Sequence, residues 1–259
     1  MPPTLYGVSE KRNWAEHHLK LVEVCIGDFI NSNPCRVITD PDPKHGIYHA
    51  RLVYPDKLPF RTLSLMIGDC VHNMRAALDY MAWELAGANI ADTGTMFPIF
   101  NSPAGFKTRG LKRVKGLPKD AQTAIERLQP YNTRYGGHLL ALDAINKIDA
   151  ADKHKILTVA VAIAELIECV PALPGNIRPE GHTFGLRHYP NVRLVHNAIV
   201  ATCFVAPPIP QVEVHFKVTP QVEFGHIPGF DNHAFVLPNL RLMLDSVDMA
   251  IKRLKPFFK

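Results

Sequence analysis

Apolar residues recur at spacings of three and four along five segments of the chain, which is the pattern of helices with one buried face. Ser9 is the predicted N-cap of the first helix, and Asn33-Pro34 ends it because the residue before a proline disfavours helical backbone. The second helix is long and stops near Gly87. The predicted helices cover residues 9–33, about 61–87, 118–131, 137–155 and 237–258.

β-Branched residues in partly alternating order predict strands elsewhere. A β-hairpin is expected from "CRVITD" and "IYHARLVY", which flank the turn-rich "PDPKHG". A small antiparallel sheet is expected from "ILTVAVAIA", "VRLVHNAIVATCFV" and "QVEVHFKV". The sequence therefore predicts an α+β protein in three parts. These are a helical bundle with an N-terminal β-hairpin (1–155), a β-rich insertion (156–230) and a C-terminal helix that packs back on the bundle (231–259).

Composition narrows the class of protein without naming a function. Hydrophobic residues make up 47% of the 259 residues and charged residues 20%, as in folded rather than disordered chains. The net charge of +5 permits an anionic partner but is too mild to indicate one. The five cysteines are scattered, without a C-x-x-C pair, and the N-terminus lacks an apolar secretory core. We expect a cytoplasmic protein without a membrane segment.

The helix predicted for residues 61–87 carries an unusual polar stripe. Its polar side lacks lysine and combines short or planar polar groups with Trp83 and Ala76, which favours a sheltered face where each polar group has a partner. The spacing allows ion pairs between Asp69 and His72 and between Arg75 and Asp79. Such a network could serve only to fix helix packing. The stripe consists of Asp69, His72, Asn73, Arg75, Asp79 and Tyr80.

A second polar motif, "DKHK", follows the helix predicted for residues 137–155. Its lysines also suit the negative end of a helix dipole. If this helix neighbours the stripe, Asp152 and His154 would join its imidazole and carboxylates. Such groups can carry out acid–base catalysis or bind a divalent metal. The metal alternative would use Asp69, His72, Asp152 and His154, but no H-x-x-x-H or E-x-x-H spacing supports it.

These two motifs together carry a family resemblance. "GDCVHNMRAALDYMAWELA" and the later "DKHK" resemble a group of uncharacterised bacterial proteins with a GD-x-x-HN-L-R-x-ALDH-x-x-W helix and a DKHR motif. The helix of that group is similar to the R-x4-H motif of the HEPN superfamily of helical bundles. Many HEPN proteins are metal-independent ribonucleases of toxin and phage-defence systems that act as homodimers.

The resemblance assigns roles residue by residue, with one departure. Arg75 takes the position of the arginine that stabilises charge on the phosphate. Tyr80 occupies the position of the histidine that acts as acid or base, and a phenol with a pKa near 10 is a poor base at neutral pH. His72 lies one turn before Arg75 and is the alternative imidazole, although the motif itself does not assign it that role.

A basic stretch, "KTRGLKRVKGLPK", lies in the Pro- and Gly-punctuated connection between the second and third helices. Its cations have no intervening acid, and two glycines indicate a flexible loop. Such a loop can follow the phosphates of RNA, or it can simply be a solvated surface. The candidate nucleic-acid-binding residues are Lys107, Arg109, Lys112, Arg113 and Lys115.

The leading hypothesis is a HEPN-like bundle acting on RNA as a homodimeric, metal-independent nuclease, or a degenerate relative of one. Arg75 would neutralise phosphate, His72 or His154 would transfer the proton, and Asp69 or Asp79 would orient the imidazole. The alternatives are a binding module for a nucleotide, nucleic acid or protein, and the metal-dependent hydrolase. The leading hypothesis implies no cofactor and no metal.

Overall fold

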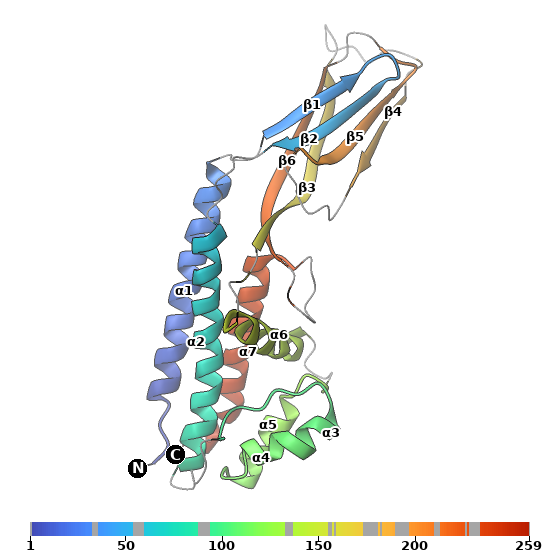
Figure 1. The fold of residues 1–259 in the computed structure, drawn as a ribbon. Helices are drawn as coiled ribbons and strands as arrows, with labels where there is room; N and C mark the ends of the chain where they lie inside the picture. The colour runs from blue at the N-terminus through green and yellow to red at the C-terminus, as the bar shows by residue number, and fades with distance from the viewer. Residues whose placement is uncertain are drawn as a thin grey trace. The chain divides into compact units, whose positions relative to one another are not determined.

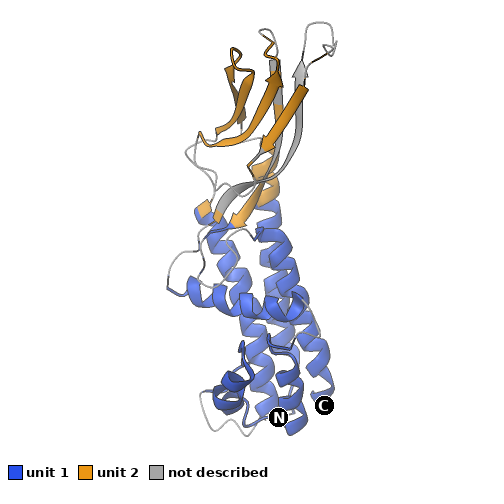
Figure 2. Cartoon of the chain, turned by 90° about the vertical axis from the view of Figure 1, so that its right-hand side faces the viewer, with its two compact units in different colours: residues 1–25, 61–158, 224–259 blue, residues 26–60, 159–223 orange. Residues whose placement is uncertain are grey.

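A computed structural model of the protein divides the chain into two compact units, coloured separately in Figure 2. Unit 1 comprises Met1–Cys25, Arg61–Thr158 and Phe224–Lys259, and unit 2 comprises Ile26–Phe60 and Val159–Glu223. The described residues are 2–32, 36–53, 60–87, 94–132, 137–154, 157, 159–172, 181, 183–189, 197–209, 213–225, 227 and 234–258.

Long helices from both ends of the chain form unit 1. In Figure 1, α1 lies beside α2, and α6 runs across the long helices next to α7. Ion pairs also join α1 to α7, since Arg12 binds both carboxylate oxygens of Asp248 and Arg241 binds Glu23. The helices are α1 (Tyr6–Asn31), α2 (Phe60–Ala86), α5 (Lys119–Arg127), α6 (Gly137–Asp152) and α7 (Val236–Leu254).

The core of unit 1 lies where apolar helix faces meet. The buried face of α2 contains the apolar residues that recur at helical spacing, together with Arg75 from the polar stripe, and α7 contributes an apolar stripe at helical spacing. One prediction about α1 was wrong. Ser9 lies inside the helix, with its N–H donating to the carbonyl of Leu5, so it is not the N-cap. Buried core residues of α2 and α7 include Leu63, Ile67, Met74, Leu78, Leu240, Val247 and Leu254.

The basic connection is helical, which corrects the prediction of a flexible loop. Short turns follow one another as α3 (Pro103–Gly105), the π-helical turn η2 (Phe106–Gly110) and α4 (Leu111–Arg113). Gly110 is buried rather than free to bend, because a Cβ there would come within 2.8 Å of Phe106 and 3.1 Å of Phe100. Its role is to allow close packing of the helix on these two rings.

Unit 2 is built on antiparallel β-structure. Its four-stranded sheet has the order β1-β2-β5-β4, and β3 and β6 form a separate two-stranded sheet. Tyr48, Cys203, Val205 and Val214 form a buried cluster. The strands are β1 (Arg36–Asp42), β2 (Ile47–Val53), β3 (Val159–Ala172), β4 (Thr183–His188), β5 (Ile199–Ala206) and β6 (Glu213–Phe224).

The fold confirms an α+β protein with a small antiparallel sheet, but it divides differently from the prediction. The hairpin β1–β2 was assigned to the helical bundle, whereas it belongs to unit 2. The reason is register: β2 pairs with β5, placing Ile47 opposite Phe204 and Ala50 opposite Ala201. Strand β4 was not predicted. Within the described residues, no helix combines the length and apolar character needed to cross a membrane.

Candidate functional site

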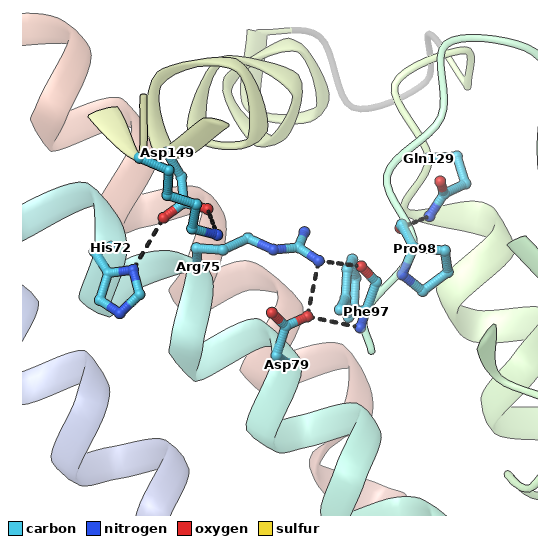
Figure 3. Close-up of polar contacts among 8 residues, drawn as sticks. His72, Arg75, Asp79, Phe97, Pro98, Gln129 and Asp149 are labelled. Atoms are coloured by element: carbon cyan, nitrogen blue, oxygen red, sulfur yellow. Dashed lines mark hydrogen bonds and ion pairs between the residues drawn. The ribbon is translucent and has the colours of Figure 1, made fainter. Parts of the chain in front are cut away.

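The first element of the candidate site is a clamp between α2 and the segment that follows it (Figure 3). Nη2 of Arg75 donates to Oδ1 of Asp79 at 2.8 Å and to the carbonyl of Phe97 at 2.7 Å. The backbone N–H of Phe97 donates to the same Oδ1 at 2.9 Å. The predicted Arg75–Asp79 ion pair is therefore confirmed, and it also fixes Phe97 against α2.

Burial governs the electrostatics of this clamp. Arg75 is only 6% exposed, and its Nη1 is buried without a hydrogen-bond partner among the described residues. Burial raises the pKa of Asp79 above its usual value, although the charge of Arg75 and the N–H of Phe97 oppose the rise. In this structure, Arg75 donates its hydrogen bonds to Asp79 and to the carbonyl of Phe97.

The clamp continues through Gln129, just beyond α5. Its Nε2 donates to the carbonyl of Pro98 at 2.9 Å (Figure 3), and its Oε1 accepts from the N–H of Phe100 at 3.0 Å. Gln129 is fully buried, so both amide groups are satisfied by backbone, as buried polar groups require. Residues 97–100 are thus held from two sides, by α2 and by Gln129.

The second element is an imidazole held by a carboxylate of another helix. Nδ1 of His72, on α2, lies 3.0 Å from Oδ1 of Asp149, on α6 (Figure 3). The other oxygen of Asp149 accepts from Nζ of Lys153 at 2.6 Å. The His72 side chain is 55% exposed and that of Asp149 only 7%. A buried acid therefore orients a half-exposed imidazole and leaves Nε2 as the nitrogen able to exchange a proton.

Asp152 brings the second motif against the first. A Cβ on Gly68 would lie 2.6 Å from both carboxylate oxygens of Asp152, so the end of α6 rests on the one residue of α2 that lacks a side chain there. Burial, followed by the charges of Asp69 and Asp149, raises the pKa of Asp152, and His72 opposes the rise. The two motif-bearing segments meet, as the sequence analysis proposed.

The remaining candidate residues make no hydrogen bond to the His72–Asp149 pair among the described residues. Asn73 donates to the carbonyl of Asp69 and accepts from Lys11 of α1. Asp69 and His154 are exposed, and His154 bonds through its backbone N–H to Ala151. The ring of Tyr80 lies over Gly7 of α1, on the wall of a pocket of about 450 Å³ with Asp79, Trp83, Glu84 and Thr95. Neither Asp69 nor Asp79 holds the imidazole of His72, which corrects that assignment.

Asp149 was missed because it looks like an ordinary polar residue inside a helix. The signal was its position, since Asp149 follows Leu142 by seven and Ile145 by four and so falls on the apolar face. A carboxylate on a buried face requires a partner. Lys153, assigned only to the helix dipole, is one of the two partners found.

The five basic candidates divide into two groups. The guanidinium carbons of Arg109 and Arg113 lie 5.3 Å and 5.6 Å from the ring centroid of Phe100, within cation–π range. Lys107, Lys112 and Lys115 are exposed. The arginines alone among the five line a pocket, whose other described residues come from residues 99–102 and from α6.

Across the described ranges, no group of three or more His, Cys, Asp or Glu side chains is arranged to hold a metal ion, and the four residues of the metal alternative are all within those ranges. The chain matches no protein-family model, no curated protein and no solved structure.

Proposed function

We propose that this chain is a HEPN-like protein that cleaves RNA without a metal, with His72 as the proton-transfer group. One observation carries the proposal: a half-exposed imidazole on one motif-bearing helix is oriented by a buried carboxylate from the other. An Asp–His pair of this kind fixes the imidazole and stabilises its protonated form, which is what a general base requires.

In the proposed reaction, Nε2 of His72 takes the proton of a ribose 2′-hydroxyl. The 2′-oxygen then attacks the adjacent phosphorus, and the bond from phosphorus to the 5′-oxygen breaks. The products are a 2′,3′-cyclic phosphate and a 5′-hydroxyl end. The leaving oxygen needs a proton, and Asp152 is the proposed donor, because burial and neighbouring carboxylates raise its pKa and favour the protonated acid.

Arg75 takes a different role in this proposal from the one that the resemblance implies. Its guanidinium is buried and bonded to Asp79 and Phe97, so we assign it to positioning rather than to phosphate contact. Asp149 takes the orienting role that the sequence analysis gave to Asp69 or Asp79. As in the superfamily that the motifs resemble, the proposed active form is a homodimer, which sedimentation of the purified protein tests directly.

The decisive experiment measures cleavage of single-stranded RNA in the presence of EDTA. The variant His72→Gln removes the imidazole and is expected to slow cleavage roughly 10²- to 10⁴-fold, the usual contribution of a general base. His45→Gln is a matched control, since His45 also places Nδ1 2.7 Å from a carboxylate, that of Asp42, but in a surface turn of unit 2. Equal rates for both variants would contradict the proposal, and loss of cleavage in EDTA would favour the metal-dependent hydrolase.

A non-catalytic binding module is the second candidate, and the burial of Arg75 favours it. An internal arginine, together with Tyr80 at the histidine position, is what a bundle that has lost cleavage would contain. RNA or nucleotide binding without any cleavage above that of His72→Gln would support this candidate. The two functions thus separate in one pair of measurements.

A further inference from the structure

We infer that the pocket beneath Arg109 and Arg113 binds the phosphate group of a nucleotide or an RNA strand. The pocket has a volume of about 530 Å³, within the range of small-molecule sites. Segment 99–102, the helical turns η2 and α4, and α6 provide its walls. The described lining residues are Ile99, Phe100, Asn101, Ser102, Arg109, Arg113, Asp143, Asn146 and Lys147.

The two arginines place two positive charges over one aromatic ring. They are spaced i,i+4 and both stack on Phe100, so two like charges share one side of a helical turn. Like charges at this spacing repel by a few tenths of a kcal/mol in an isolated helix. Neither guanidinium has a carboxylate partner within the part of the chain that the structure describes. A bound anion would relieve the repulsion and pair with both groups.

The rest of the lining does not neutralise the two arginines. The one acidic residue among the described lining residues, Asp143, is already engaged by Lys147 and by the side-chain amide of Asn101. Burial lowers the pKa of Arg113, and the nearby charges of Arg75 and Arg109 lower it further, with Asp79 opposing. The Asp143–Lys147 pair is therefore neutral, and the charges of Arg109 and Arg113 remain uncompensated within the described lining.

The aromatic ring beneath the arginines is closely packed. The backbone N–H of Phe100 is bonded to Gln129, and Gly105 and Gly110 each allow close contact with the ring: a Cβ at either position would lie 3.1 Å from it. A stacked guanidinium keeps its edge N–H groups free to donate while its face is covered. The site thus presents two guanidinium groups, whose several N–H donors match phosphate oxygens better than a single point charge would.

Phosphate is the ligand class that this chemistry favours, and the pocket is larger than a phosphate ion needs. The amide of Asn146, the Oδ1 of Asn101 and the hydroxyl hydrogen of Ser102 are available to bond a sugar or base attached to it. The inference does not rest on His72 or on cleavage. It concerns a different set of residues, and its test measures binding.

The test is isothermal titration of the full chain at low salt with inorganic phosphate, AMP and a single-stranded RNA pentamer. Arg109→Gln and Arg113→Gln are each expected to weaken binding of AMP and RNA roughly tenfold or more, the value of a charge-assisted hydrogen bond. Arg127→Gln is the matched control. It removes one exposed arginine of α5 that does not line the pocket, and we expect it to change affinity less than about twofold.

The three probes distinguish the sources of the phosphate. Binding of phosphate and AMP that competes with RNA places a terminal phosphate in the pocket, whereas binding of RNA alone indicates an internal phosphodiester. AMP contains no internucleotide bond, so failure of this inference and failure of the proposed cleavage are visible separately. Equal weakening in Arg109→Gln and Arg127→Gln, or no binding of any probe, would overturn the inference. Because Arg109 is exposed, its variant stays informative even if Arg113→Gln unfolds.

Discussion

Two acid–cation pairs on α2 begin only one turn apart and have opposite exposures. In the Arg75–Asp79 pair, the cation is buried, with a side chain 7% exposed, and the acid is 31% exposed. In the His72–Asp149 pair, the acid is 7% exposed and the imidazole 55%. Each helix position alone would have suggested a surface ion pair. Of the two pairs, only His72–Asp149 exposes its basic side chain, so only that pair can contact a substrate.

The partners explain this difference. Arg75 also donates to the carbonyl of Phe97, so the Arg75–Asp79 pair holds Phe97 against α2 within unit 1. His72 uses one ring nitrogen for Asp149, while Lys153 balances the remaining oxygen of that acid. Asp149 therefore uses both carboxylate oxygens on protein groups, and its contact with His72 takes up only one of the two ring nitrogens. Burial of Asp149 therefore orients the exposed imidazole of His72, whereas burial of Arg75 keeps its guanidinium from contacting a substrate.

The largest expected effect on stability comes from Arg75→Ala, which tests whether the first pair is structural. It leaves Asp79 without its cation and the Phe97 carbonyl without a donor. We expect the free energy of unfolding in urea to fall by about 2–4 kcal/mol, slightly less than for a fully buried pair because Asp79 is partly exposed.

The matching variant of the second pair is His72→Ala. Lys153 still pairs with Asp149 when the imidazole is removed. We therefore expect the free energy of unfolding to fall by less than about 1 kcal/mol. If Arg75→Ala and His72→Ala lower the free energy of unfolding equally, the Arg75–Asp79 pair would have no greater structural role than the His72–Asp149 pair.

The pH dependence of the first pair provides the next test. The folded pKa of Asp79 is raised above the usual 3.8, so the folded state holds a proton where the unfolded state has released it. Stability then falls as pH rises from about 4 through the raised pKa. Asp79→Asn removes this titration but keeps an Oδ1 able to accept from both Arg75 and Phe97.

The measurement compares urea unfolding of the wild type and Asp79→Asn at several values of pH. We expect the wild type to lose stability relative to the variant as pH rises through that window. Asp152 titrates alike in both proteins and cancels in the difference. A difference that grows in favour of the wild type with rising pH would mean that Arg75 outweighs burial.

These pairs also show how far sequence reasoning reaches. The helix over residues 60–86, its buried face and the Arg75–Asp79 pair follow from spacing within one segment, and all were predicted. The partner of His72 was not, because the packing angle of α6 decides which carboxylate meets the imidazole. The basic segment was read as a loop from its glycines, but Gly110 serves ring packing instead.

The meeting of the two motifs lies between these cases. If the two helices were neighbours, Asp152 was expected near His72, but local patterns identified no contact point. The contact is Gly68, and glycine in a helix interior costs about 1 kcal/mol relative to alanine, so a structural reason for it was to be expected. Strand β2 joined the sheet of unit 2 for a comparable reason, since pairing with β5 is a long-range choice that local patterns do not specify.

Gly68→Ala tests the surroundings of the His72–Asp149 pair by moving the carboxylate of Asp152 away from it. The added Cβ displaces the carboxylate of Asp152, while alanine favours the helix, so we expect stability to change by less than about 1 kcal/mol. The readout is the pKa of Asp152 from carbon NMR, which should fall toward its usual value once the carboxylate reaches solvent.

Gly27→Ala is the control for that variant. Gly27 lies within α1, and a Cβ there would meet nothing within 4 Å. We expect it to stabilise the protein by about 0.5–1 kcal/mol and to leave the pKa of Asp152 unchanged. An unchanged pKa in Gly68→Ala as well would show that the close contact does not govern this carboxyl group.

The smallest expected effect is that of Tyr80→Phe, which tests whether a third group on α2 belongs to either pair. The phenol hydroxyl makes no hydrogen bond among the described residues, and the ring lies over Gly7 with 43% of the residue exposed. Removing the hydroxyl should change the free energy of unfolding by less than about 0.5 kcal/mol, whereas Tyr80→Ala, which also removes the ring, should cost about 1 kcal/mol. A cost above 1 kcal/mol for Tyr80→Phe would assign the hydroxyl a structural partner. Tyr80 would then have a structural role like that of the Arg75–Asp79 pair.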